Sequence, residues 1–321
     1  IETLMDCHFE MWLVRSLEIG ANRDIGVRSD AMDETSAWER KQAFRCIARI
    51  FDVCPRLFGA ALTKSLIAVA SQREDRLRAL AVELLRNVLL SNPQLVAECD
   101  GTKLLFDAVV DPSLAFLAEP LMLSLLSVLN RSESRLSLRP FHDVQSLLAP
   151  FTDIDFKFTA DQAEVWAASR QALVLMLRSW AGIVILSSDS HGLSSVLRLL
   201  KDHAVDSELQ FAVLDLVVDS LHPVFKAFRR DLPKAQSPHE QHDTLQRGHY
   251  GIVAEQTYAA VLCSAFIHCG LVEGLTFLGV RGEDSGETSL RSRAIDILAN
   301  FLVVVARIFP EDSSVEFLSM P

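Results

Sequence analysis

Three residues near the C-terminal end have the side-chain types of a zinc site: Cys263, His268 and Cys269. Zinc in proteins is bound by thiolate and imidazole, and a structural site closes four ligands. On one helix, Cys263 and His268 would point about 140° apart around the axis, and no second ligand pair follows in the chain. We therefore interpret the two cysteines as buried thiols beside a histidine, and we predict no metal site.

A second group of possible ligands lies in a stretch rich in proline and glutamine: His239, His242, Asp243 and His249. Metal binding needs a cage that holds the ligands in geometry, and partners that orient each imidazole. Nothing in this stretch supplies either of them. We interpret it as a solvated loop.

Asp153 and Asp155 have the chemistry for acid–base catalysis, but no nucleophile or electrophile-stabilising group accompanies them. We expect Thr152 and Asp153 to cap a short helix instead. The chain also lacks a phosphate-binding glycine loop, His-Glu-x-x-His, Gly-x-Ser-x-Gly and Cys-x-x-Cys. We therefore predict that the protein is not an enzyme and uses no cofactor.

One local excess of positive charge is present, with Phe225 and Phe228 interleaved; it consists of Lys226, Arg229, Arg230 and Lys234. Such a patch could meet an acidic segment of a partner or phosphoinositide head groups. The alternative is the solvated end of a helix, where cations suit the helix dipole. We name these four residues as the candidate partner-contact site.

Composition narrows the class of protein. The 321 residues carry a net charge of −11, which disfavours nucleic acid as a partner. Six cysteines are scattered without a framework spacing, so we expect reduced thiols in a cytosolic protein. We find no uninterrupted apolar run long enough for a membrane helix; the stretch that comes closest, 297–309, contains Asn300 and Arg307. The start, Ile1-Glu2-Thr3, lacks an initiator Met and a basic leader, so we expect a fragment of a longer protein.

The stretch 73–110 is the clearest structural unit, and other parts of the chain repeat its pattern. Its apolar residues recur at helical spacing, which predicts one amphipathic helix: Leu77, Leu80, Ala81, Leu84, Leu85, Val88 and Leu89. Asn92-Pro93 ends that helix, and Asp100-Gly101 separates two shorter ones. One long helix and two short ones cannot bury their apolar faces alone, so they must stack on neighbours.

Six further long amphipathic helices follow the same pattern. The centres of the seven apolar faces are separated by 41, 40, 48, 40, 48 and 37 residues, and they are Phe44, Leu85, Leu125, Leu173, Val213, Val261 and Leu298. Armadillo and HEAT repeats recur at about 40–47 residues. We predict an all-α fold, an armadillo/HEAT-like right-handed α-solenoid of about six to seven helical repeats. It would form a single domain over 1–321, with loops near 20–35 and 229–248.

Several local signals place the ends of these helices. We expect a helix over 36–53, Pro120 in the first turn of the next long helix, and a capping box from Thr159 to Gln162. Gly182 should interrupt the helix that carries Trp180, and His222-Pro223 should weaken the following one.

Five stretches read together resemble the N-terminal region of the Rictor family, also called pianissimo. They are 39–43 (ERKQA), 75–96 from DRLR to NPQLV, 149–153 (APFTD), 178–182 (RSWAG), and 264–275 from SAFI to GLVEGL. The likeness extends from about residue 13 to 310 and contains no catalytic signature. Where family members often have proline between the tryptophan and glycine of the fourth stretch, this chain has Ala181.

The resemblance implies a non-catalytic scaffold subunit of TOR complex 2, a serine/threonine kinase assembly. Such a subunit would contact the TOR kinase and the Sin1-type subunit and help to present AGC-kinase substrates. It would be cytoplasmic, with peripheral membrane association at the plasma membrane through the complex.

Two other functions stay open at this point. The chain could be another armadillo/HEAT adaptor, which co-purification with a TOR kinase would distinguish. It could also be a helical enzyme, which a deep pocket holding several residues of shifted pKa would support.

Overall fold

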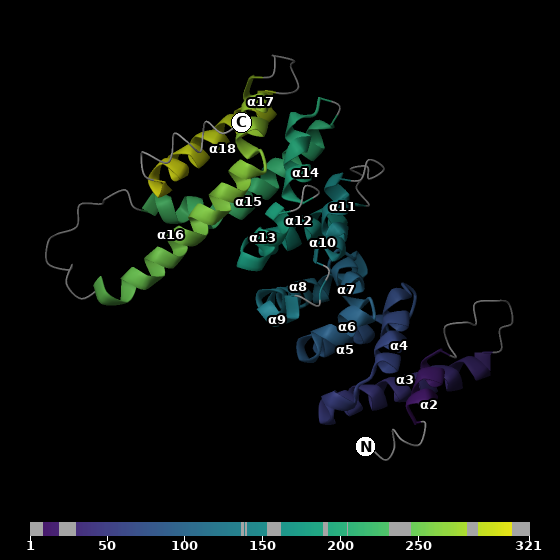
Figure 1. The fold of residues 1–321 in the computed structure, drawn as a ribbon. Coiled ribbons are helices and arrows are strands. Elements are labelled where there is room, and N and C mark those ends of the chain that lie inside the picture. The colour runs from purple at the N-terminus through teal and green to yellow at the C-terminus, as the bar shows by residue number, and fades with distance from the viewer. Residues whose placement is uncertain are drawn as a thin grey trace. The chain divides into compact units, whose positions relative to one another are not determined.

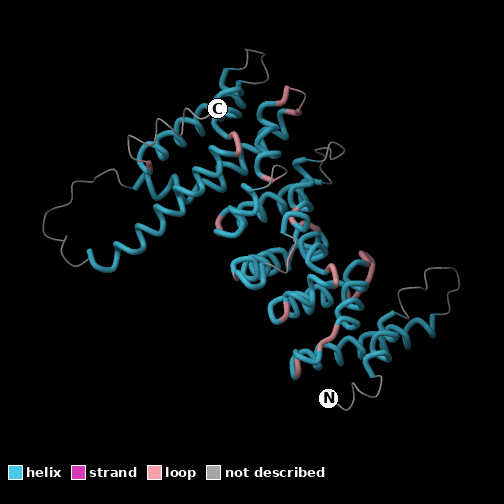
Figure 2. Tube along the Cα trace, in the orientation of Figure 1, coloured by secondary structure: helices cyan, strands magenta, loops and turns pink. Residues whose placement is uncertain are grey.

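The computed structural model describes residues 9–18, 30–135, 138, 140–152, 162–188, 192–203, 205–230, 245–280 and 288–309. Within these ranges every regular element is a helix and no strand occurs, which confirms the all-α prediction (Figures 1 and 2). The chain divides into two compact units, Ile1–Leu147 with Glu164–Ala172, and Leu148–Ala163 with Leu173–Pro321. We describe each unit by itself, and the single domain stays a prediction.

The first unit is built from helices of very different length. They are α2 (Phe9–Glu18), α3 (Asp30–Val53), η1 (Pro55–Leu57), α4 (Ala60–Ser71), α5 (Arg78–Ser91), α6 (Pro93–Glu98), α7 (Gly101–Val109), η2 (Pro112–Leu114), α8 (Ala115–Asn130), α9 (Ser132–Arg135), α10 (Pro140–Asp143) and parts of α11 (Gln145–Thr152) and α12 (Ala163–Leu177).

The predicted unit at 73–110 is present as α5, α6 and α7. The Oδ1 atom of Asn92 accepts a hydrogen bond from the Leu95 amide at 3.2 Å, and Pro93 begins α6, as the Asn-Pro pair indicated. Asp100 adopts a left-handed conformation with φ of 58° before α7. That conformation turns the chain sharply, so that α7 can return along α5 and α4.

Burial along α5 follows the predicted apolar face with one exception. Ala81, Leu85 and Val88 are fully buried, but Leu80 is 46% exposed and Val82 is buried in its place. The prediction for Leu80 was wrong: α5 packs against α4, α6, α7 and α8, and its buried surface includes Val82 and leaves out Leu80. Contacts of this kind cannot be derived from the periodicity of α5 alone.

Helices of the first unit pack against elements that are near in sequence. The helix α4 contacts α2, α5 and α7, and α8 contacts α5 and α7. The helices α4, α5 and α8 therefore pack in chain order, with α5 in contact with both α4 and α8.

Two arginines join successive helical groups in the same way, and we call each arginine with its two partners an arginine clamp. Arg40 Nε donates to the carbonyl of Leu17 at 2.9 Å, and its Nη2 donates to Asp75 Oδ2 at 2.5 Å. The other carboxylate oxygen of Asp75 accepts from the Leu77 amide at 2.8 Å. The guanidinium thus connects the end of α2 to the turn that precedes α5.

The second clamp repeats this geometry one group later. Arg78 Nε donates to the carbonyl of Ala70 at 3.1 Å, and its Nη2 donates to Asp111 Oδ2 at 2.5 Å. The Oδ1 atom of Asp111 accepts from the Ser113 amide at 2.9 Å. Both arginines pair with an aspartate about one repeat onward, at separations of 35 and 33 residues. The repeat seen in the apolar pattern is therefore also present in the polar contacts.

Two helices of the first unit begin earlier than predicted. α3 starts at Asp30 rather than Ser36, so only part of the predicted loop 20–35 lies outside the described residues. α8 starts at Ala115, which places Pro120 inside the helix rather than in its first turn. Pro120 has no N–H to donate to the main-chain carbonyl of Phe116, a residue that is 70% exposed.

The segment Pro112–Asn130 is long and apolar enough to cross a membrane by length and composition, which our search for an uninterrupted apolar run missed. Two bent helix pairs also meet this test when each pair is taken together. Half of Pro112–Asn130 is buried, and Leu121, Leu125 and Val128 of α8 are fully buried. These buried residues belong to the helix that packs against α5 and α7.

The second unit contains the remaining helices. Among the described residues these are the end of α11 from Leu148, the end of α12 from Leu173, α13 (Trp180–Ser188), α14 (Leu193–Arg198), η4 (Leu199–Lys201), α15 (Ser207–Arg230), α16 (Leu245–His268), α17 (Leu271–Val280) and α18 (Thr288–Ile308). α18 packs against α15, α16 and α17, and α13 packs against α16. Phe266 and Phe301 are fully buried between these helices.

A sharp corner joins α12 to α13, and it differs from the predicted interruption. α12 ends at Leu177 and α13 begins at Trp180, so the break precedes Gly182, which lies inside α13. The two helices are bent by 108°. A Cβ atom on Gly182 would lie 2.1 Å from the Met176 carbonyl oxygen, so only glycine allows this approach. Trp180 does not extend the buried face of α12 and is 48% exposed.

α15 continues through Pro223, where we expected it to weaken. Proline has no N–H for the carbonyl four residues earlier, which belongs to Asp219. Arg178 Nη2 from the α12–α13 corner donates to that carbonyl at 3.4 Å. A tertiary contact thus supplies a donor where the helix itself cannot.

Candidate functional site

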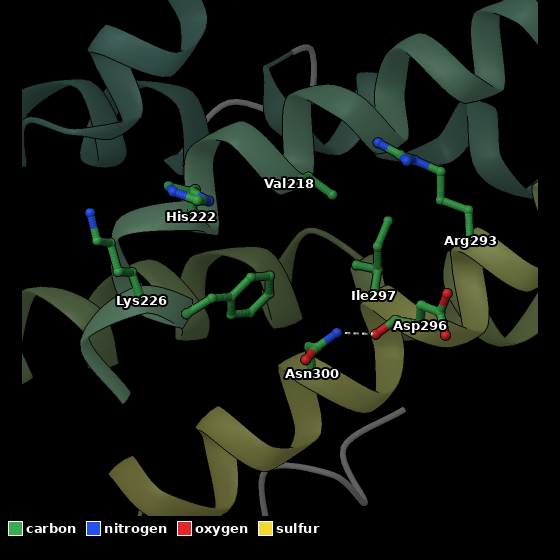
Figure 3. Close-up of a pocket in the computed structure, with 8 residues that line it drawn as sticks. Val218, His222, Lys226, Arg293, Asp296, Ile297 and Asn300 are labelled. Carbon is green, nitrogen blue, oxygen red and sulfur yellow. Dashed lines mark hydrogen bonds between the residues drawn. The ribbon is translucent and has the colours of Figure 1, made fainter. Parts of the chain in front are cut away.

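An open groove of about 670 Å³ lies between α15 and α18 in the second unit (Figure 3). On the α15 side it is lined by Val218, His222, Phe225 and Lys226. These positions recur every three to four residues, so they share one face of the helix. The adjacent face of α15 contains Val217, Leu221 and Val224, which are buried and fix the helix against the core. The groove wall is therefore held rigidly.

The α18 side of the groove is more polar. Arg293, Asp296 and Asn300 lie along it, and Ile297, only 4% exposed, lies between them at the base. Asn300 Nδ2 donates to the Asp296 carbonyl at 2.7 Å, a bond within the helix. The combination of an apolar base with polar edges is typical of sites that bind segments or ligands.

Charges are distributed unevenly along this groove. Figure 3 shows His222 and Lys226 at one end and Arg293 with Asp296 at the other. Arg293 Nη2 pairs with Asp215 Oδ1 at 2.5 Å, so its charge is already balanced by a neighbour on α15. His222 and Lys226 are both exposed, and no ion pair joins either to another described residue.

Of the four predicted partner-contact residues, the structure places Lys226 at this groove. Arg229 and Arg230 lie in the last turn of α15, but their side chains are outside the described part of the chain, as is Lys234 entirely. Phe225, one of the interleaved aromatics, also lines the groove. Sequence reasoning missed the α18 side, because its only signal was polar residues within an apolar helix.

The groove carries groups suited to binding a ligand. Its eight lining residues include no Ser, Thr or Cys. One histidine, one lysine, one arginine and one aspartate can form ion pairs and hydrogen bonds with a bound segment.

The candidate zinc residues lie in different environments. Cys263 is fully buried, and burial raises the pKa of its thiol to about 12. Burial also raises the pKa of the Cys269 thiol, and this effect outweighs a side-chain hydrogen bond with Ser194 that lowers the pKa. His268 is exposed. In the described ranges no group of three or more His, Cys, Asp or Glu residues is placed to hold a metal ion.

Other residues singled out by their chemistry are not described. His239, His242 and Asp243 lie outside the described residues, as do Asp153, Asp155 and Thr159, and of His249 only the backbone in α16 is described. The predicted cap by Thr152 and Asp153 is not tested, because residues 153–161 lie outside the described residues. Thr152 ends α11, and its Oγ1 donates back to the Leu148 carbonyl at 3.1 Å.

The α12–α13 corner exposes a second surface feature in the same unit. The Trp180 ring packs edge-on against Tyr258 of α16, with ring centroids 5.7 Å apart. Tyr258 Oη donates to the Leu177 carbonyl at 2.6 Å, one of the carbonyls left without a partner at the end of α12. Val184 on α13 and Val261 on α16 are also exposed. Tryptophan, tyrosine and arginine are the residues most often dominant in protein interfaces.

Comparison with known proteins gives consistent similarities. A family model described as "Rapamycin-insensitive companion of mTOR, N-term" matches residues 1–310. Protein pianissimo A of Dictyostelium discoideum is 30% identical over 87% of this chain and 25% of its own length. The rapamycin-insensitive companion of mTOR of Homo sapiens is 25% identical over 90% of this chain and 18% of its own length.

A fission yeast relative is similar to the same part of the chain. Target of rapamycin complex 2 subunit ste20 of Schizosaccharomyces pombe is 24% identical over 88% of this chain and 23% of its own length. The chain thus spans a quarter or less of the length of these curated relatives.

Proposed function

The chain belongs to the family of the N-terminal region of the rapamycin-insensitive companion of mTOR, and on this premise we propose that it is a non-catalytic scaffold region of a TOR complex 2 subunit. The observation that carries the proposal is the family match over residues 1–310, nearly the whole chain. It confirms the resemblance seen in the sequence.

The proposed architecture is an armadillo/HEAT-like right-handed α-solenoid of about six to seven repeats. Support comes from the groups of one long and several shorter helices and, in the first unit, from packing between successive groups. The two arginine clamps support it further, because they join successive groups with the same donor and acceptor types.

A scaffold role fits the chemistry of the described surface. The α15–α18 groove is open and is lined by an apolar base with charged and polar side chains at its edges. The described thiols with raised pKa, Cys99, Cys263 and Cys269, are buried and so are poor nucleophiles at neutral pH. Stacked helices present extended surfaces that bind peptides and protein segments.

The partners we propose are the TOR kinase, a Sin1-type subunit and AGC-kinase substrates, which this region would help to present. The fission yeast relative is itself named as a subunit of target of rapamycin complex 2. We further propose a cytoplasmic location, with peripheral association to the plasma membrane through the complex. The exposed Trp180 and Tyr258 surface is a second place where a subunit could dock.

Purification of the full-length protein from its own cells tests this proposal. A tag on the chromosomal copy should recover a TOR kinase and a Sin1-type subunit in near-equal amounts, and crosslinking mass spectrometry should join them to lysines within residues 1–310. A different stable set of partners without a TOR kinase would support the alternative, another armadillo/HEAT adaptor, and would refute the proposal.

A loss-of-function experiment complements the purification. Cells that lack the protein should lose phosphorylation of AGC kinases, and the full-length protein should restore it. Full-length protein with Trp180→Ala should restore less, whereas Trp38→Ala, at a tryptophan 64% exposed on α3, serves as the matched control. Equal rescue by both variants would remove Trp180 from the proposed contacts.

A further inference from the structure

The α15–α18 groove combines three properties that together specify its ligand. It has an apolar base, because Ile297 is buried there and Phe225 is half-buried beside it. It has a cationic end at Lys226, which forms no ion pair with another described residue and has His222 beside it (Figure 3). It also lies on a protein whose net charge is −11, so the cationic end differs in sign from the chain as a whole.

The cationic end selects for negative charge on the ligand. Lys226 lies in the C-terminal part of α15, and its ammonium group has no carboxylate partner among the described residues. At the opposite end Asp296 is exposed and Arg293 is neutralised by Asp215. A ligand with carboxylates along its whole length would meet Asp296 unfavourably. A ligand with carboxylates at one end only would be attracted and oriented.

The apolar base selects for a hydrophobic side chain on the same ligand. Phe225 and Ile297 come from facing helices, so one side chain inserted between them contacts both walls. Burying such a side chain gives most of the binding energy, while the charges give orientation and specificity. A helix-in-groove or extended-segment mode meets both requirements.

A membrane surface fits the groove less well than a protein segment. Recognition of anionic lipid head groups by electrostatics uses clusters of about four to eight Lys or Arg residues, whereas the described side chains of the groove provide two such residues, one of them already paired. The apolar residues lie at the base of a recess between two helices rather than on a protruding face that could enter a bilayer.

We propose that the α15–α18 groove binds an amphipathic acidic segment of a protein partner. An apolar side chain of the segment lies over Phe225 and Ile297, and its carboxylates lie at the Lys226 end. The inference deepens the proposed scaffold function and rests on it for the class of ligand, a protein segment.

The test uses the 321-residue chain and a fluorescein-labelled peptide of known sequence. The peptide has about twelve residues, with leucine and phenylalanine in one half and glutamate in the other, a length matched to about three helical turns. A second peptide replaces every glutamate with glutamine. Fluorescence anisotropy should show binding of the acidic peptide, weakened on raising the salt concentration, and binding of the glutamine peptide should be at least tenfold weaker.

Charge reversal at the groove separates specific from non-specific attraction. Lys226→Glu should weaken binding of the acidic peptide at least about fivefold. Lys41→Glu, the same change at an exposed position of α3, should leave it within about twofold and controls for net charge. A lysine version of the peptide should bind Lys226→Glu more tightly than the unaltered chain. Circular dichroism confirms that each variant is folded.

Three results would overturn the inference. One is no binding of the acidic peptide up to about 1 mM. A second is equal weakening by the Lys226→Glu and Lys41→Glu substitutions. The third is Lys226-dependent binding to phosphatidylserine vesicles without binding to the peptide, which would assign the groove to membranes. None of these bears on co-purification with a TOR kinase, so failure here is distinguishable from failure of the proposed scaffold function.

Discussion

Arg78 and Asp111 form an ion pair, Nη2 to Oδ2 at 2.5 Å, that joins the first turn of α5 to the turn before α8. Their side chains are only 11% and 15% exposed, so solvent screens the pair weakly. Ser113 contributes further, because its hydroxyl accepts from Arg78 Nη1 at 2.7 Å and donates to Asp111 Oδ1 at 2.7 Å. The pair is therefore the centre of a small network rather than an isolated surface contact.

Removing the guanidinium should destabilise the first unit. Arg78→Met keeps the apolar stem but leaves the largely buried carboxylate of Asp111 without its partner, and we expect a loss of about 2 kcal/mol in the free energy of unfolding. Arg76→Met is the matched control at an exposed arginine two residues earlier, with an expected change within about 0.5 kcal/mol. Urea denaturation measures both, and equal midpoints for the two variants would contradict the clamp.

The same pair should make stability depend on pH. Burial alone would raise the pKa of Asp111, but hydrogen bonds from Arg78 and Ser113 outweigh it and hold the pKa below the ordinary 3.8. Because the pKa of Asp111 is lower in the folded than in the unfolded state, the carboxylate stabilises the fold at pH values above the unfolded pKa of 3.8. This stabilisation is lost as the pH falls through the lower pKa of the folded state. Thermal melts of the unaltered chain and Arg78→Met should therefore differ at neutral pH and converge in acid below pH 3.8. A difference that is constant with pH would show that the pair does not titrate.

Glycine should be essential at position 182. A Cβ there would lie 2.1 Å from the Met176 carbonyl oxygen and 2.6 Å from its carbonyl carbon, both backbone atoms that cannot rotate away. Gly182→Ala should cost about 2–4 kcal/mol, since the α12–α13 corner must open. Gly279→Ala in α17 is the control, because its Cβ would meet Ile295 at an ordinary 3.4 Å. That variant should be neutral or gain up to about 1 kcal/mol.

Tyr258 should titrate at unusually high pH. Burial raises the pKa of its phenol to about 12, although the nearby Arg178 lowers it slightly. The folded protein therefore keeps the neutral phenol, and this contribution to stability is lost as the pH rises from the ordinary 10 towards 12. Ultraviolet absorbance of tyrosinate should show a late component that is absent in Tyr258→Phe. The substitution should also cost about 1 kcal/mol, for the lost bond to Leu177.

Thiol labelling should distinguish the exposed from the buried cysteines among those described. Cys46 is exposed, whereas Cys99, Cys263 and Cys269 are buried with raised pKa. Maleimide should modify Cys46 in the native protein and the three buried cysteines only after denaturation. Rapid native modification of Cys263, identified by mass spectrometry, would contradict the packing of α16.

Helix positions could be predicted from the sequence because each long helix carries its own apolar face. Leu121, Leu125 and Leu129 of α8 are all buried as their spacing indicated. The predictions of helix ends were wrong where packing against a neighbouring element determined the local structure. α15 continues through Pro223 because burial of Leu221 and Val224 on either side outweighs one missing hydrogen bond, and Arg178 reaches the Asp219 carbonyl.

The candidate site was only half predictable for the same reason. Lys226 and Phe225 stand out in the sequence because charge and aromatic residues alternate there. Arg293, Asp296 and Asn300 give no such signal, since polar residues on an amphipathic helix are ordinarily solvated. They become part of the groove only because α18 packs against α15, a contact between distant parts of the chain.

Arg40 and Arg78 connect successive helical groups through the same contacts, so the group at 73–110 carries an aspartate for the preceding group and an arginine for the following one. Duplication or deletion of one whole group would leave matching ends. A protein built from such groups can gain or lose whole groups during evolution, while the contacts between neighbouring groups stay the same.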